Sequence, residues 1–514
     1  MGHLSSALAG ARPLRITNAD VVYFSAILFI LPNLVFITAF SAVAAVVVAA
    51  GAGVAAYVFK SGLSCNSQGL LTTPIDWRGL TACFIVGLSL CLLGGEDHVF
   101  FAGSDWFTRD AVLSDLVRGG PLVAYHYRGE DYLLRAPLGM YLTPALIGQF
   151  WGLEKAHLAL LVQNSLLFAS ILYLLTRLTE TSKLRFVLLF IFFSAVDIIP
   201  RIAVDYLQYQ QTGKFELSPL TMLWNPMFSY WGNIPLLFWV PNHALPGWFF
   251  AVLFLLHLRR EVDAAALGLA FAFLLMWSPL ALIGALPFLA LAIFRALLSN
   301  LASFRDIVAV AAAMCFAPVA LYLTADAESV SRDWPILDEG FLWHYLQLLV
   351  FSIPQSWIIL AMWSRVDGQY KTAVGLAILL LCVFPIYRIG GGNDLAMRGT
   401  IVPLFIVAFA FCEMVPSILA DGRAAAWATV AVVTLSAATG IMEIRRAVAD
   451  PSYAINDCNL LNVSDKIAEG SLPANYLGRL SRMPAWLLGK AGAPLTAEAR
   501  VCWPNYSLLP ERVR

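Results

Sequence analysis

The sequence predicts an all-α, polytopic integral membrane protein, and three observations lead to this fold class. Hydrophobic residues make up 60% of the 514 residues, charged residues make up only 13%, and the mean hydropathy is +0.75. Apolar runs of about 20 residues recur along the chain, which is the length that a helix needs to cross roughly 30 Å of hydrocarbon. The net charge is zero, so no basic surface is expected to bind nucleic acid.

The apolar runs predict about thirteen membrane-spanning helices. The segment 136–152 is less apolar, and we expect it to form a short or re-entrant helix. No cleavable signal peptide is expected, because the first apolar run is longer than a signal-peptide core. The expected spans cover residues 20–38, 41–59, 79–94, 157–176, 184–200, 236–257, 264–280, 281–298, 306–324, 341–361, 371–387, 399–419 and 423–441.

Charged loops predict the orientation of these helices. Acidic or longer loops at 95–135, 201–235, 325–340 and 388–398 are expected to face outward, and short basic loops alternate with them on the cytoplasmic side. The chain thus divides into a transmembrane domain, 1–441, and a small extracytoplasmic tail, 442–514, that caps it. The cytoplasmic cations are Arg12, Arg15, Lys60, Arg78, Arg177, Lys183, Arg185, Arg259, Arg260, Arg295, Arg305, Arg365 and Lys371.

Two cysteines, Cys458 and Cys502, stand alone in the tail, whereas the other six lie in or near expected spans. A tail on the outer side of a membrane lies in a compartment where disulfides persist, so these two residues are candidates for a disulfide. Two unpaired thiols are the alternative.

The loop 95–135 interrupts the apolar sequence with seven carboxylates and four arginines. A helix that starts near Ser104 would have Ser104 as its N-cap and would place Asp105 and Arg109 on one face. Carboxylates at a hydrophobic boundary are candidates for a raised pKa and a base function, and Arg109 is a candidate substrate-binding cation. A solvated segment with ordinary surface ion pairs is the alternative. The candidate catalytic residues are Asp105, Glu96, Asp97 and Asp110.

A second polar element is Asn242-His243, which lies between Pro241 and Pro246 at the outer mouth of an apolar span. The prolines are expected to unwind the helix and open backbone donors to a ligand, so His243 and Asn242 are candidates for binding a phosphate or a hydroxyl. A kinked helix start with a hydrogen-bonded histidine is the alternative. Most of the nearby tryptophans are expected to form an interfacial aromatic belt, namely Trp224, Trp231, Trp239 and Trp248.

A third element is the glycine-rich loop 387–398, which joins two spans and carries an arginine near each end. Guanidinium groups match phosphate in a bidentate way and stay charged near lipid, so this loop is a candidate site for an anionic headgroup. A tight hairpin whose arginines reach lipid headgroups is the alternative. The candidate donor-binding residues here are Arg388, Asn393, Asp394 and Arg398, to which we add Arg135 at the end of the first outer loop.

A many-span chain with an aspartate before an aromatic residue in its first outer loop (Asp105-Trp106), followed by Arg135-Ala-Pro-Leu-Gly-Met-Tyr-Leu142, resembles the GT-C membrane glycosyltransferases. The Pro-Leu element is similar to that of protein O-mannosyltransferases and lipid A aminoarabinose transferases, and the whole resembles uncharacterised bacterial members. The similarity covers mainly residues 79–250. Ala136-Pro137 replaces the Pro-Pro of the mannosyltransferases, and the expected Asp-Glu pair is absent, with Glu96-Asp97 lying nine residues before Asp105.

The resemblance implies a GT-C-like helical fold in the bacterial inner membrane, with an active site that faces the periplasm. It implies a sugar donor linked to a polyprenyl phosphate and a lipid, glycan or protein acceptor. Asp105 would accept the proton of the acceptor hydroxyl, while Arg388, Arg398, His243 or Arg135 would stabilise the departing phosphate. No cofactor follows from the residues, and the resemblance leaves open a divalent metal linked to a carboxylate of the first loop.

Two other classes of protein remain as alternatives. A polysaccharide polymerase or ligase is also polytopic, but its large outer loops would come later in the chain. A lipid or solute transporter usually places charged or broken-helix sites near the membrane midplane, in repeated halves, and no internal repeat is evident. The chain has no Walker loop, no HExxH and no CxxC motif, so soluble nucleotide chemistry and structural zinc motifs lack support.

Overall fold

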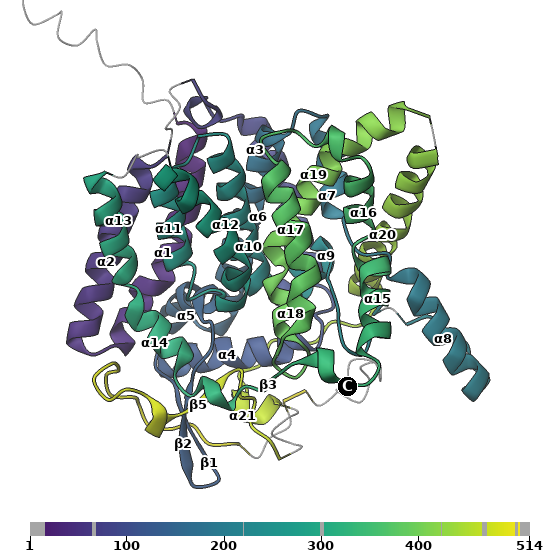
Figure 1. The fold of residues 1–514 in the computed structure, drawn as a ribbon. Coiled ribbons are helices and arrows are strands. Elements are labelled where there is room, and N and C mark those ends of the chain that lie inside the picture. The colour runs from purple at the N-terminus through teal and green to yellow at the C-terminus, as the bar shows by residue number, and fades with distance from the viewer. Residues whose placement is uncertain are drawn as a thin grey trace, which may run out of the picture.

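The computed structural model describes residues 16–63, 68–218, 220–298, 303–422, 424–464, 470–498 and 502–503, and these residues are mostly helical (Figure 1). Seven helical segments are long and apolar enough to cross a membrane, or eight if one pair bent by 67° counts as a span. The seven are α1 (Asn18–Phe36) with η1 (Ile37–Ala39), α2 (Ala42–Ser61), α6 (Leu153–Leu178), α12 (Pro279–Leu298), α13 (Phe304–Met314) with α14 (Ala317–Thr324), α19 (Ile401–Ala420) and α20 (Ala424–Ala449), and the bent pair is α15 (Phe341–Ser352) with α16 (Pro354–Ala361).

The other expected spans are shorter or broken helices. Three of them are apolar but short, α7 has only nine residues, and α9 is separated from α10 at Val240. The prediction of a helical protein with several membrane-length apolar helices is confirmed, whereas the count of thirteen spans is not. These segments are α3 (Trp77–Leu93), α7 (Lys183–Ile191), α9 (Asn233–Trp239), α10 (Pro241–Leu258), α11 (Ala264–Phe273) and α17 (Lys371–Val383) with η7 (Phe384–Ile386).

Prolines explain where several of these helices stop and start. α10, α12 and α16 begin at Pro241, Pro279 and Pro354, where proline lacks an N–H and disfavours a helical residue before it. The expected boundary between spans 264–280 and 281–298 is therefore wrong, since α11 ends at Phe273 and α12 begins at Pro279. α20 also continues to Ala449, past the expected end of the transmembrane domain at 441.

A helix occupies part of the segment 201–235, where an outer loop was expected. α8 (Ile198–Thr212) projects from the bundle beside α20, as Figure 1 shows. Ile199, Ile202 and Tyr206 lie on it at intervals of three and four residues and are all exposed. Amphipathic helices with such an apolar stripe lie at membrane interfaces. The segment 136–152 forms α5 (Gly139–Trp151), whose 13 residues span only about 20 Å, in agreement with the expected short helix.

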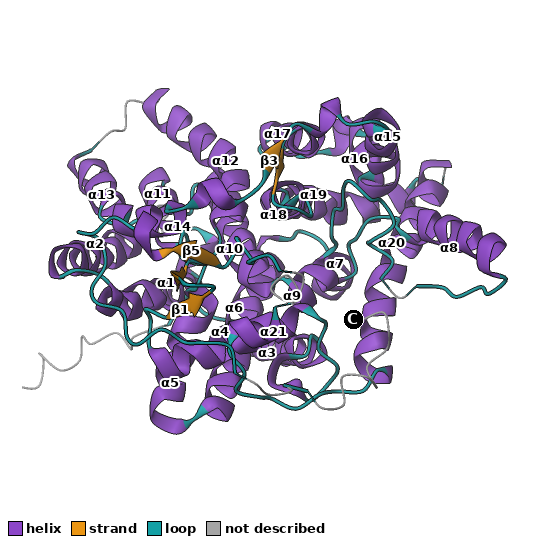
Figure 2. Ribbon diagram, turned by 90° about the horizontal axis from the view of Figure 1, so that it is seen from below, coloured by secondary structure: helices purple, strands orange, loops and turns teal. Residues whose placement is uncertain are grey.

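The first loop and the tail build one layer, which we call the cap, at one end of the helical bundle. The cap contains α4 (Asp105–Gly119), a three-stranded antiparallel sheet and α21 (Leu460–Val463). Within the sheet, Leu133 pairs with Gly478 of the tail. In the view from the cap end (Figure 2), helices surround this sheet, and β3 lies apart from it near α17. The strands are β1 (Ala124–Tyr127), β2 (Glu130–Leu134), β5 (Leu477–Arg479) and, in a separate pair, β3 (Arg332–Asp333) with β4 (Arg388–Ile389).

Hydrogen bonds join the tail to two further loops, and short helices lie between the main elements. Asn475 of the tail donates to Asp394 of α18 at 3.2 Å, and the backbone of Arg479 donates to Asp326 at 2.9 Å, so the loops around residues 326 and 394 meet the cap. The remaining elements are α18 (Asp394–Gly399), η2 (Leu70–Thr72), η3 (Glu96–His98), η4 (Ala327–Ser329), η5 (Pro335–Leu337), η6 (Trp363–Arg365) and η8 (Leu480–Arg482).

Basic loops meet one another away from the cap. Lys183 lies 3.2 Å from Asp76, and Arg259 lies 3.2 Å from Glu180. Arg365 pairs with Asp421 between the loops that follow α16 and α19. Of the cations expected on the cytoplasmic side, Arg12 and Arg15 lie outside the described residues.

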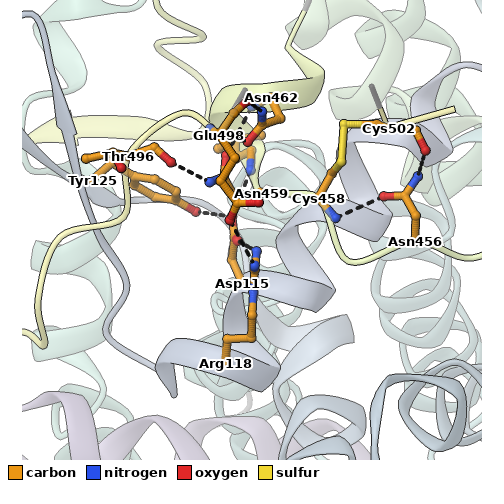
Figure 3. A network of polar contacts seen from close by, with 11 residues as sticks. Asp115, Arg118, Tyr125, Asn456, Cys458, Asn459, Asn462, Thr496, Glu498 and Cys502 are labelled. Carbon is orange, nitrogen blue, oxygen red and sulfur yellow. Dashed lines mark hydrogen bonds and ion pairs between the residues drawn. A yellow bond between two sulfur atoms is a disulfide. The ribbon is translucent and has the colours of Figure 1, made fainter. Parts of the chain in front are cut away.

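Asp115 is the polar anchor of the cap (Figure 3). Its carboxylate accepts hydrogen bonds from the hydroxyl of Tyr125 at 2.7 Å and the backbone N–H of Leu460 at 2.9 Å, and it pairs with Arg118 at 2.9 Å. One side chain thus joins α4, β1 and the tail. Nearby, Cys458 and Cys502 form a disulfide, so the paired reading of these two cysteines is the one that the structure has.

Asp115 should give the stability of the cap a distinct pH dependence. Burial raises the pKa of its carboxyl group from 3.8 to about 6, against the hydrogen bonds from Tyr125 and Leu460 and the charge of Arg118. Because the folded pKa exceeds the unfolded one, the stability contributed by Asp115 is fully present below about pH 4 and is lost as the pH rises through 6. The loss is on the order of 3 kcal/mol.

We therefore expect the difference in stability between the wild type and Asp115→Asn to shrink as the pH rises from 4 to 7. Thermal unfolding of the purified protein in detergent at both pH values measures this difference. Glu130→Gln, at an exposed position of β2, is the matched control and should give the same difference at both pH values. A difference that grows with pH would contradict the assignment.

Gly284 of α12 packs closely against the junction of α18 with α19. A Cβ atom at this position would lie 1.8 Å from the carbonyl oxygen of Gly399. Gly284→Ala should therefore force the two helices apart, with an expected loss of about 1–3 kcal/mol and a lower melting temperature. Gly268→Ala in α11 is the matched control, because its added Cβ meets no atom within 4 Å and should leave the melting temperature equal or slightly higher.

Candidate active site

Helix α4 carries the central residues of the candidate site. It starts at Asp105 with Ser104 at the N-cap, as expected, although the Ser104 side chain makes no capping hydrogen bond. The indole N–H of Trp106 donates to the carbonyl of Phe238 at 3.0 Å and fixes the first turn on the break between α9 and α10. Because helices of the bundle cover one side of α4 and the rest of the cap covers the other, its polar residues Arg109 and Asp110 are buried.

Asp105 and Arg109 form the expected pair on one face of α4. The Nη2 atom of Arg109 lies 3.4 Å from Oδ2 of Asp105, and the two side chains are 4% and 43% exposed. The Nε and Nη1 groups of Arg109 have no hydrogen-bond partner among the described residues. Burying such donors is costly unless they are satisfied, so Arg109 is a cation with open donors for an anion, next to an accessible carboxylate.

Arg398 supplies a second cation, from α18. Its Nη1 atom lies 3.1 Å from Asp394 of the same helix, and its Nε group has no partner among the described residues. Asn393, which was expected to bind the donor, is the N-cap of α18, and its side-chain oxygen accepts from the N–H of Ala396 at 3.2 Å. Asp394 also accepts from Asn475 of the tail. Asn393 and Asp394 therefore orient Arg398.

Hydrogen bonds join α4 to the break before α10, through Trp106 and Phe238, and join α18 to the tail, through Asp394 and Asn475. The charges of Arg109 and Arg398 both act on the ring of His243. Burial raises the pKa of Tyr476 in the tail, while the charges of Arg109 and Arg398 oppose this rise and those of Asp105 and Asp394 add to it. Burial acts to lower the pKa of Arg109, but Tyr141 of α5 and Asp105 act to raise it, and the pKa is raised overall. We call Asp105, Arg109, Tyr141, His243, Arg398 and Tyr476 the two-arginine cluster.

His243 and Asn242 lie in the first turn of α10, and each has only 6% of its surface exposed. The Nδ1 atom of His243 lies 2.7 Å from the hydroxyl of Ser278, and its Nε2 atom lies 3.2 Å from Nδ2 of Asn242. The expected break in the helix is present at Val240, directly before Pro241. The structure thus has the kinked helix start and the hydrogen-bonded histidine of the alternative, and the charges of two arginines act on this histidine.

The predicted aromatic belt is wrong. All four tryptophans are buried, with 8% or less of their surface exposed. Trp224 donates to Asp197 at 2.7 Å and Trp239 donates to Glu443 at 3.0 Å, so these indoles serve buried carboxylates. The ring of Trp239 also packs on Gly103, two residues before Asp105, and helps to hold the start of α4.

Two expected donor-binding arginines are used elsewhere. Arg388 donates two hydrogen bonds of 2.7 Å to Asp333 and one of 3.1 Å to Asp338, which ties β4 to the loop that contains β3. The guanidinium of Arg135 donates to the carbonyls of Leu323 and Ala474 and fixes the end of β2 between α14 and the tail. Both arginines therefore have structural partners.

The other three candidate carboxylates differ from Asp105. Glu96 is buried, accepts from Asn164 at 2.9 Å, and has a pKa that burial raises to about 8, so it is protonated at neutral pH. Asp97 has a left-handed backbone, with φ at 64°, and burial raises its pKa. Asp110 lies 3.0 Å from the Nε2 atom of His98. Of the four, only Asp105 is both accessible and next to an open cation.

Several residues of this region were missed by sequence reasoning. Tyr141 lies in the Pro-Leu-Gly-Met-Tyr element, so a signal for it was present. Gly139 of that element explains part of its pattern, since a Cβ there would lie 2.3 Å from the ring of Trp277, and its N–H donates to Met276 at 2.8 Å. This close approach seats the start of α5 beside Ser278. Tyr476, in contrast, has no sequence signal that connects the tail to the cluster.

The chain matches no family model, no curated protein and no solved structure. Its chemistry is therefore inferred from the two-arginine cluster. Two guanidinium groups with open donors suit a phosphate or another oxyanion. A half-exposed carboxylate beside them suits the acceptance of a proton from a hydroxyl.

Proposed function

We propose that the protein is a membrane glycosyltransferase of the GT-C type. It transfers a sugar from a polyprenyl-phosphate donor to a hydroxyl of a lipid, glycan or protein acceptor on the outer face of the bacterial inner membrane. The observation that carries this proposal is the contact of the half-exposed Asp105 with the buried Arg109, whose Nε and Nη1 donors are open. The cluster joins a proton acceptor to a site for a leaving phosphate.

The residues of the cluster have defined roles in this reaction. Asp105 accepts the proton of the acceptor hydroxyl, whose oxygen forms a bond to the anomeric carbon of the sugar. The bond between that carbon and the phosphate oxygen breaks, and its electron pair leaves with the polyprenyl phosphate. Arg109 and Arg398 stabilise the charge that develops on this oxygen. The neutral side chains of Tyr141 and Tyr476 supply hydrogen bonds for the phosphate or the sugar.

An apolar groove is available for the polyprenyl chain. It has a volume of about 520 Å³ and lies between α1, α5 and α6, where Leu28, Pro144 and Val162 are among its lining residues. Pro144 follows Tyr141 by about one helical turn, so the groove begins close to the cluster. A lipid tail in this groove leaves its phosphate at the end of the bundle where Arg109 lies. The chemistry and the lipid binding site therefore meet on α5.

The position of the cap supports an outward-facing site. The cap contributes Asp105, Arg109 and Tyr476 to the cluster, and the same layer contains the disulfide between Cys458 and Cys502. Disulfides persist in oxidising compartments such as the periplasm and are rare in the cytosol. The cluster and the disulfide lie at the same end of the molecule, in agreement with the proposed location.

The test is transfer from a panel of radiolabelled polyprenyl-phosphate sugars by purified protein in nanodiscs. Turnover of one donor, with release of polyprenyl phosphate and sugar on the acceptor, is expected. Arg398→Gln should lower this rate, whereas Arg388→Gln removes an arginine that pairs with Asp333 and should leave it unchanged. No turnover of any donor, with passage of labelled lipid across liposome membranes, would reject the glycosyltransferase and favour a transporter.

A further inference from the structure

Three buried side chains behind the two-arginine cluster form a second polar group. They are His98 in η3, Asp110 in α4 and His157 in α6, and one ligand atom from each lies within 4.8 Å of the others. The Nε2 atom of His98 lies 3.0 Å from Oδ2 of Asp110, and the two imidazole rings lie 5.4 Å apart, edge to face. Because the three come from different segments, no sequence spacing announces this group.

One member of this group, His157, lacks a polar partner among the described residues. Both ring nitrogens of His157 are buried and have no hydrogen-bond partner among the described residues. His157 itself is fully buried, and Asp110 is 1% exposed. A buried imidazole without any partner is costly, and each such case in a native structure needs an explanation. A cation between the three side chains would provide one.

The backbone is also held in an unusual shape at this point. Asp97 and His98 both have positive φ angles, 64° and 56°, which non-glycine residues adopt rarely. The hydrogen bond of 2.9 Å from Asn164 to Glu96 fastens η3 to α6. Asn164 lies seven residues after His157, on the same face of α6, so this contact turns His98 toward His157. Strained backbone of this kind persists where the surroundings fix it, often at binding sites.

We propose that His98, Asp110 and His157 bind one divalent transition-metal ion, best matched by zinc, which fastens the first loop to α6. Two imidazole nitrogens and one carboxylate form a typical ligand set for zinc, whereas calcium and magnesium prefer oxygen ligands alone. The second oxygen of Asp110 can fill a further coordination position. All three ligands are buried and Asp105 is not among them, so the metal is structural and takes no part in sugar transfer. This proposal does not rest on the proposed function.

The metal content of the purified full-length protein tests the proposal. The protein is isolated through a tag without histidine, and its metal is quantified by mass spectrometry after exposure to zinc and removal of excess. About one zinc ion per chain is expected for the wild type and for His126→Ala, a histidine of the exposed hairpin that pairs with Asp131. His157→Ala should contain no zinc. A chelator should lower the melting temperature of the wild type, and added zinc should restore it.

A second measurement covers the case in which His157→Ala does not fold. Stripped wild-type protein is titrated with Co²⁺, whose intense visible absorption reports a low-coordinate site with nitrogen ligands. Absorption that saturates at one equivalent and disappears on addition of Zn²⁺ would support the site. No absorption, no zinc in the wild type, or zinc retained by a folded His157→Ala protein would overturn it and leave a metal-free pair of His98 and Asp110.

Discussion

Asp105→Asn is expected to lower the rate of sugar transfer by about 10²- to 10⁴-fold, because a positioned general base contributes that much to a proton transfer. Asparagine keeps the size of the side chain but cannot accept the proton of the acceptor hydroxyl. Asp105 is 43% exposed and its one ionic partner, Arg109, lies at 3.4 Å, so the melting temperature should change little. Release of polyprenyl phosphate in a single turnover measures the rate of the chemical step directly.

Asp131→Asn is the matched control for this experiment. Asp131 is 44% exposed, pairs with His126 and lies in the hairpin of the same loop. Its replacement removes an equally accessible carboxylate and should leave the rate unchanged. An Asp105→Asn protein with full activity would exclude Asp105 as the base and would direct attention to Asp97, which is half-buried in η3.

Arg109→Gln is expected to lower kcat/KM for the donor by about 10²- to 10³-fold, which is the effect of removing one preorganised donor from a developing negative charge. Glutamine is neutral and shorter, so both open donors of the guanidinium are lost. Arg109→Lys keeps the charge without the planar fork, and its rate should lie between those of the wild type and Arg109→Gln. Steady-state kinetics with the donor that turns over in the panel measure kcat/KM, and binding of the product polyprenyl phosphate measures the affinity of the phosphate site.

Burial of Arg109 makes a stability control necessary. The side chain is 4% exposed and stacks over Trp106 at 5.3 Å, so a neutral replacement also changes packing. Arg128→Gln, at the turn of the hairpin, removes an arginine that donates to the carbonyl of Gly470 and lies over the ring of Tyr127, away from the two-arginine cluster. It should retain full activity. If Arg109→Gln and Arg109→Lys bind polyprenyl phosphate as tightly as the wild type does, Arg109 is not part of the phosphate site.

Local patterns in the sequence predicted much of the helical structure. Apolar runs of sufficient length placed helical segments correctly, and the start of α4 near Ser104 followed from a residue type that favours N-caps. Ends of helices were less predictable. The break between α11 and α12 depends on Pro279 and on a distant partner for the backbone of the break, since the carbonyl of Met276 accepts from the N–H of Gly139.

Features that depend on partners from distant segments could not be predicted. Trp239 resembles a belt residue in sequence, but its burial follows from Glu443, which lies about 200 residues later. Arg388 and Arg398 lie in the same glycine-rich loop, and the local sequence does not distinguish their roles. Arg388 pairs with Asp333, which lies 55 positions earlier in the chain, whereas Arg398 pairs with Asp394 of its own helix. His157 occurs alone in an apolar helix, and nothing in its neighbourhood along the chain indicates His98 or Asp110.

The pairing of β5 with β2 has a consequence for the biogenesis of the protein. Arg135 donates a hydrogen bond to the carbonyl of Ala474, which lies 339 positions later in the chain. Tyr476 likewise joins residues that the ribosome made long before it. Until the tail has been made, the cluster contains Asp105 and Arg109 but lacks Tyr476. We therefore expect the nascent chain to become competent for the proposed transfer only after β5 and Tyr476 have been made and have packed against the first loop.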